Sequence, residues 1–112
     1  MPRMRLKAII AVLLLAMPGV VNATADYRVG QKDKIFSVAV LSIKPGDRVT
    51  FDNDDQTTHN VYSSQKGLTS FSFNLKSQAP GTSATVVFDK EGTYEIRCAF
   101  HAKMKLVITV KK

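Results

Sequence analysis

The chain has 112 residues, with 16 lysines and arginines against 9 aspartates and glutamates, and 45% of it is hydrophobic. This length is enough for one domain and leaves no room for a second. Because the sequence holds one cysteine and two histidines, it excludes an internal disulfide, a zinc finger with four Cys/His ligands and an enzyme with several metal ions. No apolar stretch reaches the roughly 18 uninterrupted residues that a conventional membrane-spanning helix needs.

Residues 1–25 have the composition of a secretory signal peptide. A basic segment comes first, an apolar run over residues 8–21 comes next, and small residues at alternate positions follow. The alternative is an uncleaved membrane anchor, but Pro18-Gly19 would break its helix and the apolar run is short for a bilayer. We therefore predict cleavage after Ala23 or Ala25 and an exported, for instance periplasmic, protein without stable membrane insertion. The basic residues of this leader are Arg3, Arg5 and Lys7.

The charge of residues 26–112, which we predict to form the single domain, is modest. The leader holds three basic and no acidic residues, so its removal lowers the net charge from +7 to +4. The remaining lysines and arginines form no cluster that alternates with aromatic residues. A nucleic-acid partner is therefore not expected.

Residues 26–112 show the two-residue alternation of apolar and polar side chains that is typical of β-strands, and no stretch has a competing helical period. Turn residues separate the runs, most clearly at Pro45-Gly46-Asp47, Pro80-Gly81 and Glu91-Gly92. About seven short strands with Pro/Gly turns between them predict an antiparallel β-sandwich. In chain order the predicted strands lie at 36–40, 48–51, 59–62, 71–75, 84–88, 93–98 and 106–110, and residues 63–70 are predicted to form a loop.

Four scarce side chains suggest a metal site. Cys98, His101 and Met104 follow one another at three-residue intervals, and Cys98 ends a strand whose alternation directs it inward. We expect residues 99–104 to form a loop in which these side chains converge, with His59 brought alongside by the polar run 52–58. Two imidazoles and a thiolate with a weak axial thioether are the donors of a blue-copper electron-transfer site.

Each donor taken alone has an ordinary explanation. Cys98 and Met104 could fill space in the core, and either histidine could be a surface or hydrogen-bonded residue. The combination is stronger, because every cysteine, histidine and methionine of residues 26–112 belongs to this one group. Copper is favoured over zinc because thiolate and thioether are soft ligands, and zinc more often closes its site with a fourth strong donor.

These residues resemble the type I copper proteins, or cupredoxins, a family that includes plastocyanin, pseudoazurin and amicyanin. The short Cys-x-x-His-x-x-Met spacing is most similar to that of amicyanin-like and methylamine-utilisation-type members. The segments 43–51, His59-Asn60-Val61 and 88–94 also resemble the family's patterns, so the resemblance covers nearly all of residues 26–112. Phe100 and Ala102 stand where relatives often have proline, which affects the surface around the site and its potential rather than the ligands.

The resemblance implies a Greek-key β-sandwich of seven to eight strands that binds one copper ion. It implies that His59, Cys98 and His101 are equatorial ligands and Met104 the axial one. It also implies that Asn60 orients the site, with its backbone N–H near the cysteine sulfur and its side chain joining the two ligand segments.

The implied function is a small shuttle that carries single electrons between transient redox partners as copper cycles between Cu(I) and Cu(II). It is expected to be a monomer and not an enzyme, since two histidines cannot supply a second copper cluster. The alternatives are a protein that binds, buffers or senses copper without electron transfer, and a metal-free adhesion module.

His101 is the expected electron port of such a shuttle. Phe100 and Ala102 could form an apolar docking patch around it, and Lys103 and Lys105 could steer an acidic partner. Simple loop packing and a solvated charged face are the alternatives for these residues.

Overall fold

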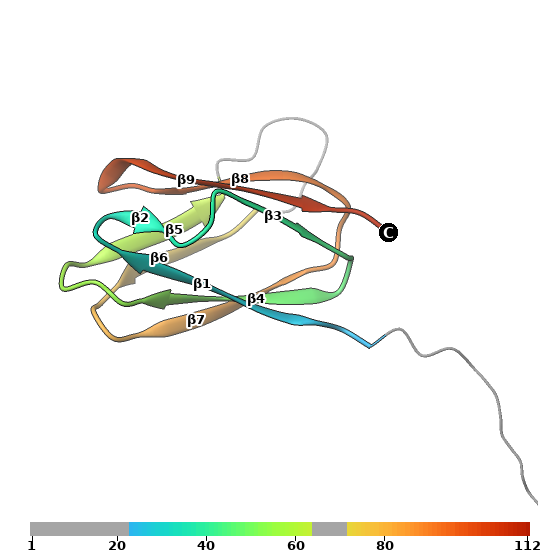
Figure 1. Cartoon of the computed structure of the whole chain (residues 1–112), viewed down its shortest axis with the longest axis horizontal. Coiled ribbons are helices and arrows are strands. Elements are labelled where there is room, and N and C mark those ends of the chain that lie inside the picture. The colour runs from blue at the N-terminus through green and yellow to red at the C-terminus, as the bar shows by residue number, and fades with distance from the viewer. Residues whose placement is uncertain (1–22, 64–71) are drawn as a thin grey trace, which may run out of the picture.

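The computed structural model describes residues 23–63 and 72–112, which form a sandwich of two β-sheets (Figure 1). Most of the predicted signal peptide and of the predicted loop at 63–70 lies outside these residues. The described part contains nine strands and no helix, so the predicted all-β sandwich is confirmed. The strands are β1 (Asp26–Lys32), β2 (Ile35–Phe36), β3 (Val40–Ile43), β4 (Asp47–Asn53), β5 (His59–Ser63), β6 (Asn74–Gln78), β7 (Ser83–Phe88), β8 (Gly92–Cys98) and β9 (His101–Val110).

The sheets are mixed, so two parallel pairs and a ninth strand are added to the predicted antiparallel sandwich of about seven to eight strands. One sheet has the order β2-β1-β4-β7 and the other β3-β9-β8-β5-β6. β1 pairs parallel with β4, and β3 pairs parallel with β9. The chain leaves the first sheet after β2, adds β3 to the second and returns as β4, and such a crossover brings β4 beside β1 in the same direction. Side-chain alternation carries no information on strand direction, so this feature could not be predicted from it.

The alternation predicted which side chains of the later strands are buried. Tyr94, Ile96 and Cys98 of β8 all lie in the core. The same holds for the alternating apolar residues of β4, β7 and β9, namely Val49, Phe51, Val86, Phe88, Leu106, Ile108 and Val110. A strand that follows a regular pleat between a core and solvent must alternate in this way, and these strands do so.

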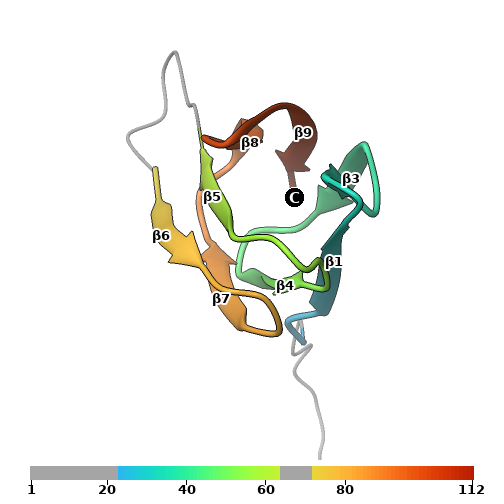
Figure 2. The ribbon, with the colours of Figure 1, turned by 90° about the vertical axis from the view of Figure 1, so that its left-hand side faces the viewer.

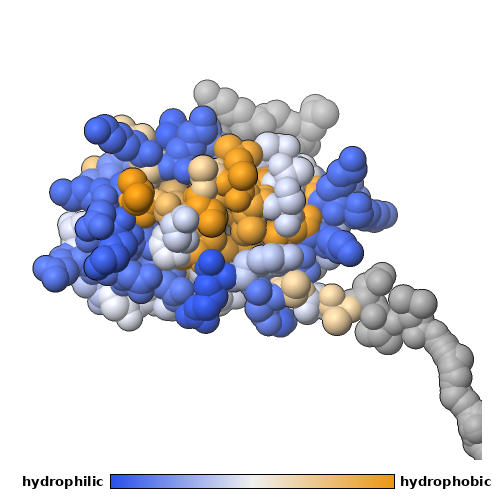
Figure 3. All heavy atoms as spheres, viewed as in Figure 1, coloured by the Kyte–Doolittle hydropathy of each residue, from blue (hydrophilic) through white to orange (hydrophobic). Residues whose placement is uncertain are grey.

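The predicted strand at 36–40 is wrong. Phe36 is buried in β2, but Val38 is 39% and Val40 71% exposed, because the chain changes sheets between β2 and β3 and the pleat does not continue. Together with Ile35, these valines leave apolar atoms on the surface, and Figure 3 shows an apolar area on the face where β3 lies in Figure 1. β1 was missed because its sequence, DYRVGQK, is too polar to be recognised as a strand.

A chain of aromatic rings fills the core between the sheets. Neighbouring rings have centroids 5.4 to 6.5 Å apart, mostly edge to face, which is the spacing at which aromatic pairs stabilise each other. The chain extends from β2 through β4 and on to β8. Its members, in order of contact, are Phe36, Phe51, Phe73, Phe88 and Tyr94.

Three connections meet at one end of the sandwich, on the left in Figure 1 and facing the viewer in Figure 2. They are the β1–β2 turn, the β4–β5 connection and the β8–β9 turn. Of the predicted metal donors, His59, Cys98 and His101 lie next to the latter two connections, and Met104 is the fourth residue of β9. The fold therefore brings to this end residues that are up to 42 positions apart in the sequence, from His59 to His101.

The β1–β2 turn gives a first testable prediction. Its two residues, Asp33 and Lys34, both have positive φ (55° and 61°), the conformation of a two-residue hairpin turn that favours Asp-Gly. Lys34→Gly should raise the free energy of unfolding of the metal-free protein by about 0.5–1 kcal/mol, because glycine adopts this conformation without the steric cost of a Cβ. Urea denaturation measures the change. Lys34→Ala removes the same charge but keeps the Cβ, and an equal gain in that variant would contradict the explanation.

Candidate metal centre

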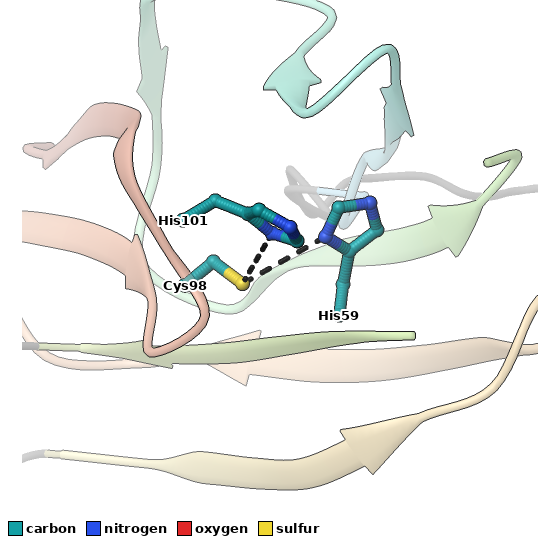
Figure 4. A group of neighbouring side chains, drawn as sticks. All are labelled: His59, Cys98 and His101. Carbon is teal, nitrogen blue, oxygen red and sulfur yellow. Dashed lines mark hydrogen bonds between the residues drawn. The ribbon is translucent and has the colours of Figure 1, made fainter. Parts of the chain in front are cut away.

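Three donors converge from the ends of three strands. His59 is the first residue of β5, Cys98 the last of β8 and His101 the first of β9. Their ligand atoms all lie within 4.8 Å of one another, and Figure 4 shows both imidazole rings turned toward the cysteine sulfur. His59 is fully buried and Cys98 is 4% exposed, whereas His101 is partly exposed. Among these three donors, His101 is therefore the one most accessible to solvent.

The geometry fits a single metal ion. Nδ1 of His59 lies 3.7 Å and Nδ1 of His101 3.6 Å from Sγ of Cys98. An ion bonded to nitrogen at about 2.0–2.1 Å and to sulfur at about 2.3 Å, at angles of roughly 110–120°, holds these atoms about 3.6–3.8 Å apart. The two imidazole rings meet edge to face with centroids 4.8 Å apart, so neither blocks the space between the donors.

The β8–β9 hairpin brings Cys98 and His101 together by an irregular register. Arg97 pairs with Lys105, yet Cys98 pairs with His101, so the three residues between His101 and Lys105 have no partners on β8. This differs from the expected loop over 99–104, because only Ala99 and Phe100 form a turn and β9 already begins at His101. The extra residues interrupt the pleat, which explains why a strand can present both His101 and Met104 on its inner side.

Asn60 joins the two ligand segments. Its backbone N–H donates to Sγ of Cys98 (3.3 Å), and its Oδ1 accepts from the backbone N–H of Ala99 (3.4 Å). Its Nδ2 donates to Oδ1 of Asn74 and to the carbonyl of Lys76, both in β6. These bonds hold the β5 strand against the β8–β9 turn, and a hydrogen bond to a thiolate tunes its charge.

The far side of His59 contacts a residue that the sequence analysis missed. Nε2 of His59 donates to Oδ2 of Asp55 at 2.9 Å. This bond, followed by bonds from the amides of Lys34 and Gln56, holds the pKa of the Asp55 carboxyl well below its usual range. The sequence does place an acidic residue four positions before the candidate ligand His59. Residues 52–55 contain three aspartates, however, so the sequence alone does not show which of them contacts the histidine.

His101 is the donor nearest to solvent. Its ring lies 6.5 Å from that of Phe100, which is 55% exposed. Partial burial, followed by the neighbouring His59 and Lys34 side chains, lowers the pKa of His101. A lowered pKa favours the neutral imidazole, which is the form that binds a metal.

The remaining predicted residues all belong to β9. Met104 is fully buried and packs in the core three residues beyond His101. Ala102, Lys103 and Lys105 are exposed on the outer side of β9. Nζ of Lys105 lies 3.4 Å from a carboxylate oxygen of Glu95, so its charge is partly balanced.

The comparison with protein families decides the identity of the chain. Residues 5–110 match the model of the cupredoxin-like domain. The chain belongs to the cupredoxin family. Cupredoxins bind one copper ion, and in this cupredoxin His59, Cys98 and His101 form its candidate site, so the predicted family and cofactor are confirmed.

Individual relatives agree with this assignment. Pseudoazurin of Methylorubrum extorquens is 37% identical over 76 residues, which cover 68% of this chain and 50% of that protein. This cupredoxin thus spans half the length of that relative. The purple cupredoxin of Nitrosopumilus maritimus is 26% identical, with a TM-score of 0.65 over 75% of this chain and 98% of that one. A reduced mutant of amicyanin, 24% identical with a TM-score of 0.67 over 75% and 80% of the two chains, shares the fold.

Proposed function

We propose that this cupredoxin is an exported, monomeric carrier of single electrons that works between transient redox partners and catalyses no reaction of its own. The observation that carries the proposal is the convergence of two imidazole nitrogens and one cysteine sulfur from the ends of three strands. The chain belongs to the cupredoxin family, and its relatedness to pseudoazurin supports a role in copper electron transfer.

The bound copper ion would supply the one-electron step, Cu(II) to Cu(I) and back. Each neighbouring residue has a separate task. His59 and Cys98 hold the buried side of the site and exclude water from it. The Asn60 amide stabilises negative charge on the sulfur. The thioether of Met104, which is buried on the same strand as His101, would supply a further, soft donor to the ion. Because donors fixed at strand ends move little when the charge changes, the cost of reorganisation stays small.

The partly exposed His101 is the proposed port for the electron. Phe100 and Ala102 lie beside it as an apolar contact, and Lys103 and Lys105 supply positive charge nearby. We include Lys34 in this group, because its backbone N–H donates to Asp55, the partner of His59. We propose that an acidic redox protein docks here through a small interface that forms and dissociates rapidly.

The proposed export depends on the leader at residues 1–25, which the sequence predicts. Within residues 23–63 and 72–112 no helix has the length and apolar character to cross a bilayer. A carrier released after cleavage would reach its partners by diffusion.

Spectroscopy of the copper-loaded protein tests the proposal. We expect an intense visible thiolate-to-copper band and narrow copper hyperfine splitting in the EPR spectrum, both lost on reduction and restored on oxidation. We also expect rapid electron self-exchange, measured by NMR line broadening in mixtures of the two oxidation states. A blue protein with slow self-exchange and ready loss of copper to a chelator would favour copper buffering. A colourless protein would contradict both functions.

A further inference from the structure

The carboxylate of Asp55 is the outer partner of the buried ligand His59. Nδ1 of the His59 ring faces Sγ of Cys98, and Nε2, on the opposite edge, donates to Asp55 at 2.9 Å. Figure 4 shows one ring nitrogen of His59 directed to the sulfur and the other directed away from it. The His59 side chain is fully buried and that of Asp55 is only 15% exposed, so solvent weakens their interaction little.

Asp55 is itself held in place by hydrogen bonds. Its Oδ2 also accepts from the backbone N–H of Lys34 (3.0 Å), and its Oδ1 accepts from that of Gln56 (3.0 Å). Its own backbone N–H donates to Oδ1 of Asn53, a side chain that is 1% exposed. Nδ2 of Asn53 in turn donates to the carbonyls of Thr57 and Gln78. The carboxylate is therefore fixed by the β1–β2 turn on one side and by the buried end of β4 on the other.

We propose that Asp55 is a positioning residue that sets both the tautomer of His59 and the redox preference of the copper site. An ionised carboxylate can only accept a hydrogen bond, so it keeps the proton on Nε2 and leaves the lone pair of Nδ1 for the metal. Its negative charge acts on the bound ion through the ring of His59. A negative charge there stabilises Cu(II), the more positive oxidation state, more than Cu(I). This inference rests on the proposed function, because it concerns the ion that the site holds there.

The competing explanation is that Asp55 serves only the fold, as a cap of the β1–β2 turn and of the β4–β5 connection. Removal of a purely structural residue lowers stability and the affinity for both copper states together. Removal of a charge that acts on the site changes the ratio of the two affinities. The reduction potential reports that ratio directly, so it separates the two explanations.

The experiment compares three variants in the copper-loaded full chain. Asp55→Asn keeps an oxygen that accepts from His59 but removes the charge, Asp55→Glu restores the charge, and Asp54→Asn removes an equal charge one residue away. For Asp55→Asn we expect the affinity for Cu(II) to fall about tenfold, the lower end of the usual loss of metal affinity when such a partner is removed, and the affinity for Cu(I) to fall much less. Tenfold corresponds to a rise in potential of about 59 mV for a one-electron couple.

The other variants complete the design. Asp55→Glu should return most of the shift, and Asp54→Asn should change the ratio less than about threefold, because Asp54 is exposed and screened by solvent. NMR of the reduced, diamagnetic protein should show a slowly exchanging Nε2 proton on His59 in the parent and in Asp55→Glu. That proton should exchange faster in Asp55→Asn, whose oxygen is a weaker acceptor.

Two results would overturn the inference: equal potentials in the parent and Asp55→Asn, or equal shifts in Asp55→Asn and Asp54→Asn. Either result would leave the proposed electron carrier intact, since the parent would still be blue and reversible. Absence of the visible band from the parent would instead contradict the proposed function itself.

Discussion

Cys98→Ser should abolish the intense visible band of the copper-loaded protein and its narrow hyperfine splitting. The band arises from charge transfer between a thiolate and copper, and Cys98 is the only cysteine in the sequence. A serine hydroxyl near the same position is a hard, neutral ligand at neutral pH, which suits neither Cu(I) nor the soft character of the site. We expect the affinity for Cu(I) to fall by several orders of magnitude.

The matched control is Ala99→Ser, which introduces the same hydroxyl one residue along the β8–β9 turn. It should keep the band. Circular dichroism and urea denaturation of the metal-free proteins then show whether Cys98→Ser still folds, as we expect for so small a change in volume. Retention of the band in folded Cys98→Ser would refute the assignment of Cys98 as a ligand.

Phe51→Ala should cause the largest loss of stability among single changes outside the site. Phe51 is fully buried in β4 and contacts the rings of Phe36 and Phe73, so its removal leaves a cavity in the aromatic chain. Such a change costs about 3–5 kcal/mol, a large share of the about 5–15 kcal/mol that holds a small domain folded. Thermal denaturation of the metal-free protein should show the midpoint lowered by more than about 10 °C.

Val87→Ala is the control, because Val87 lies on the neighbouring strand β7 and is 48% exposed. It should change the free energy of unfolding by less than about 1 kcal/mol. Copper should recover part of the loss in Phe51→Ala, since a ligand that binds only the folded state stabilises it. Equal losses of unfolding free energy in Phe51→Ala and Val87→Ala would contradict the conclusion that the chain of aromatic rings stabilises the core.

The sequence predicts most of the later strands and the members of the donor cluster. In β8 and β9 one face packs against the core and the other meets solvent, so burial and alternation agree there. For that reason the alternation predicts that Cys98 points inward at the end of a strand. The three-residue spacing then identifies His101 and Met104 as candidate donors beside it. The small number of histidines also helped the prediction, because the sequence contains only His59 and His101.

The features that escaped prediction depend on contacts between distant segments. β1 is polar on its outer side and carries a buried glutamine, Gln31, on its inner side, so its pattern resembles a loop. The parallel pairing of β1 with β4 is a property of the crossover and leaves no mark on side-chain alternation. Asp55 stands in a run of similar residues, and only the folded structure shows which of them reaches His59.

The start of β1 bears on where the leader can be removed. The N–H of Ala25 donates to the buried carboxylate of Asp47 (2.9 Å), and its carbonyl accepts from the N–H of Arg48 (2.9 Å). A peptidase that cut after Ala25 would discard both bonds and leave Asp47 with one acceptor oxygen to satisfy. The anchoring of Ala25 thus favours the earlier of the two predicted scissile bonds, and the proposed exported form would then begin at Thr24.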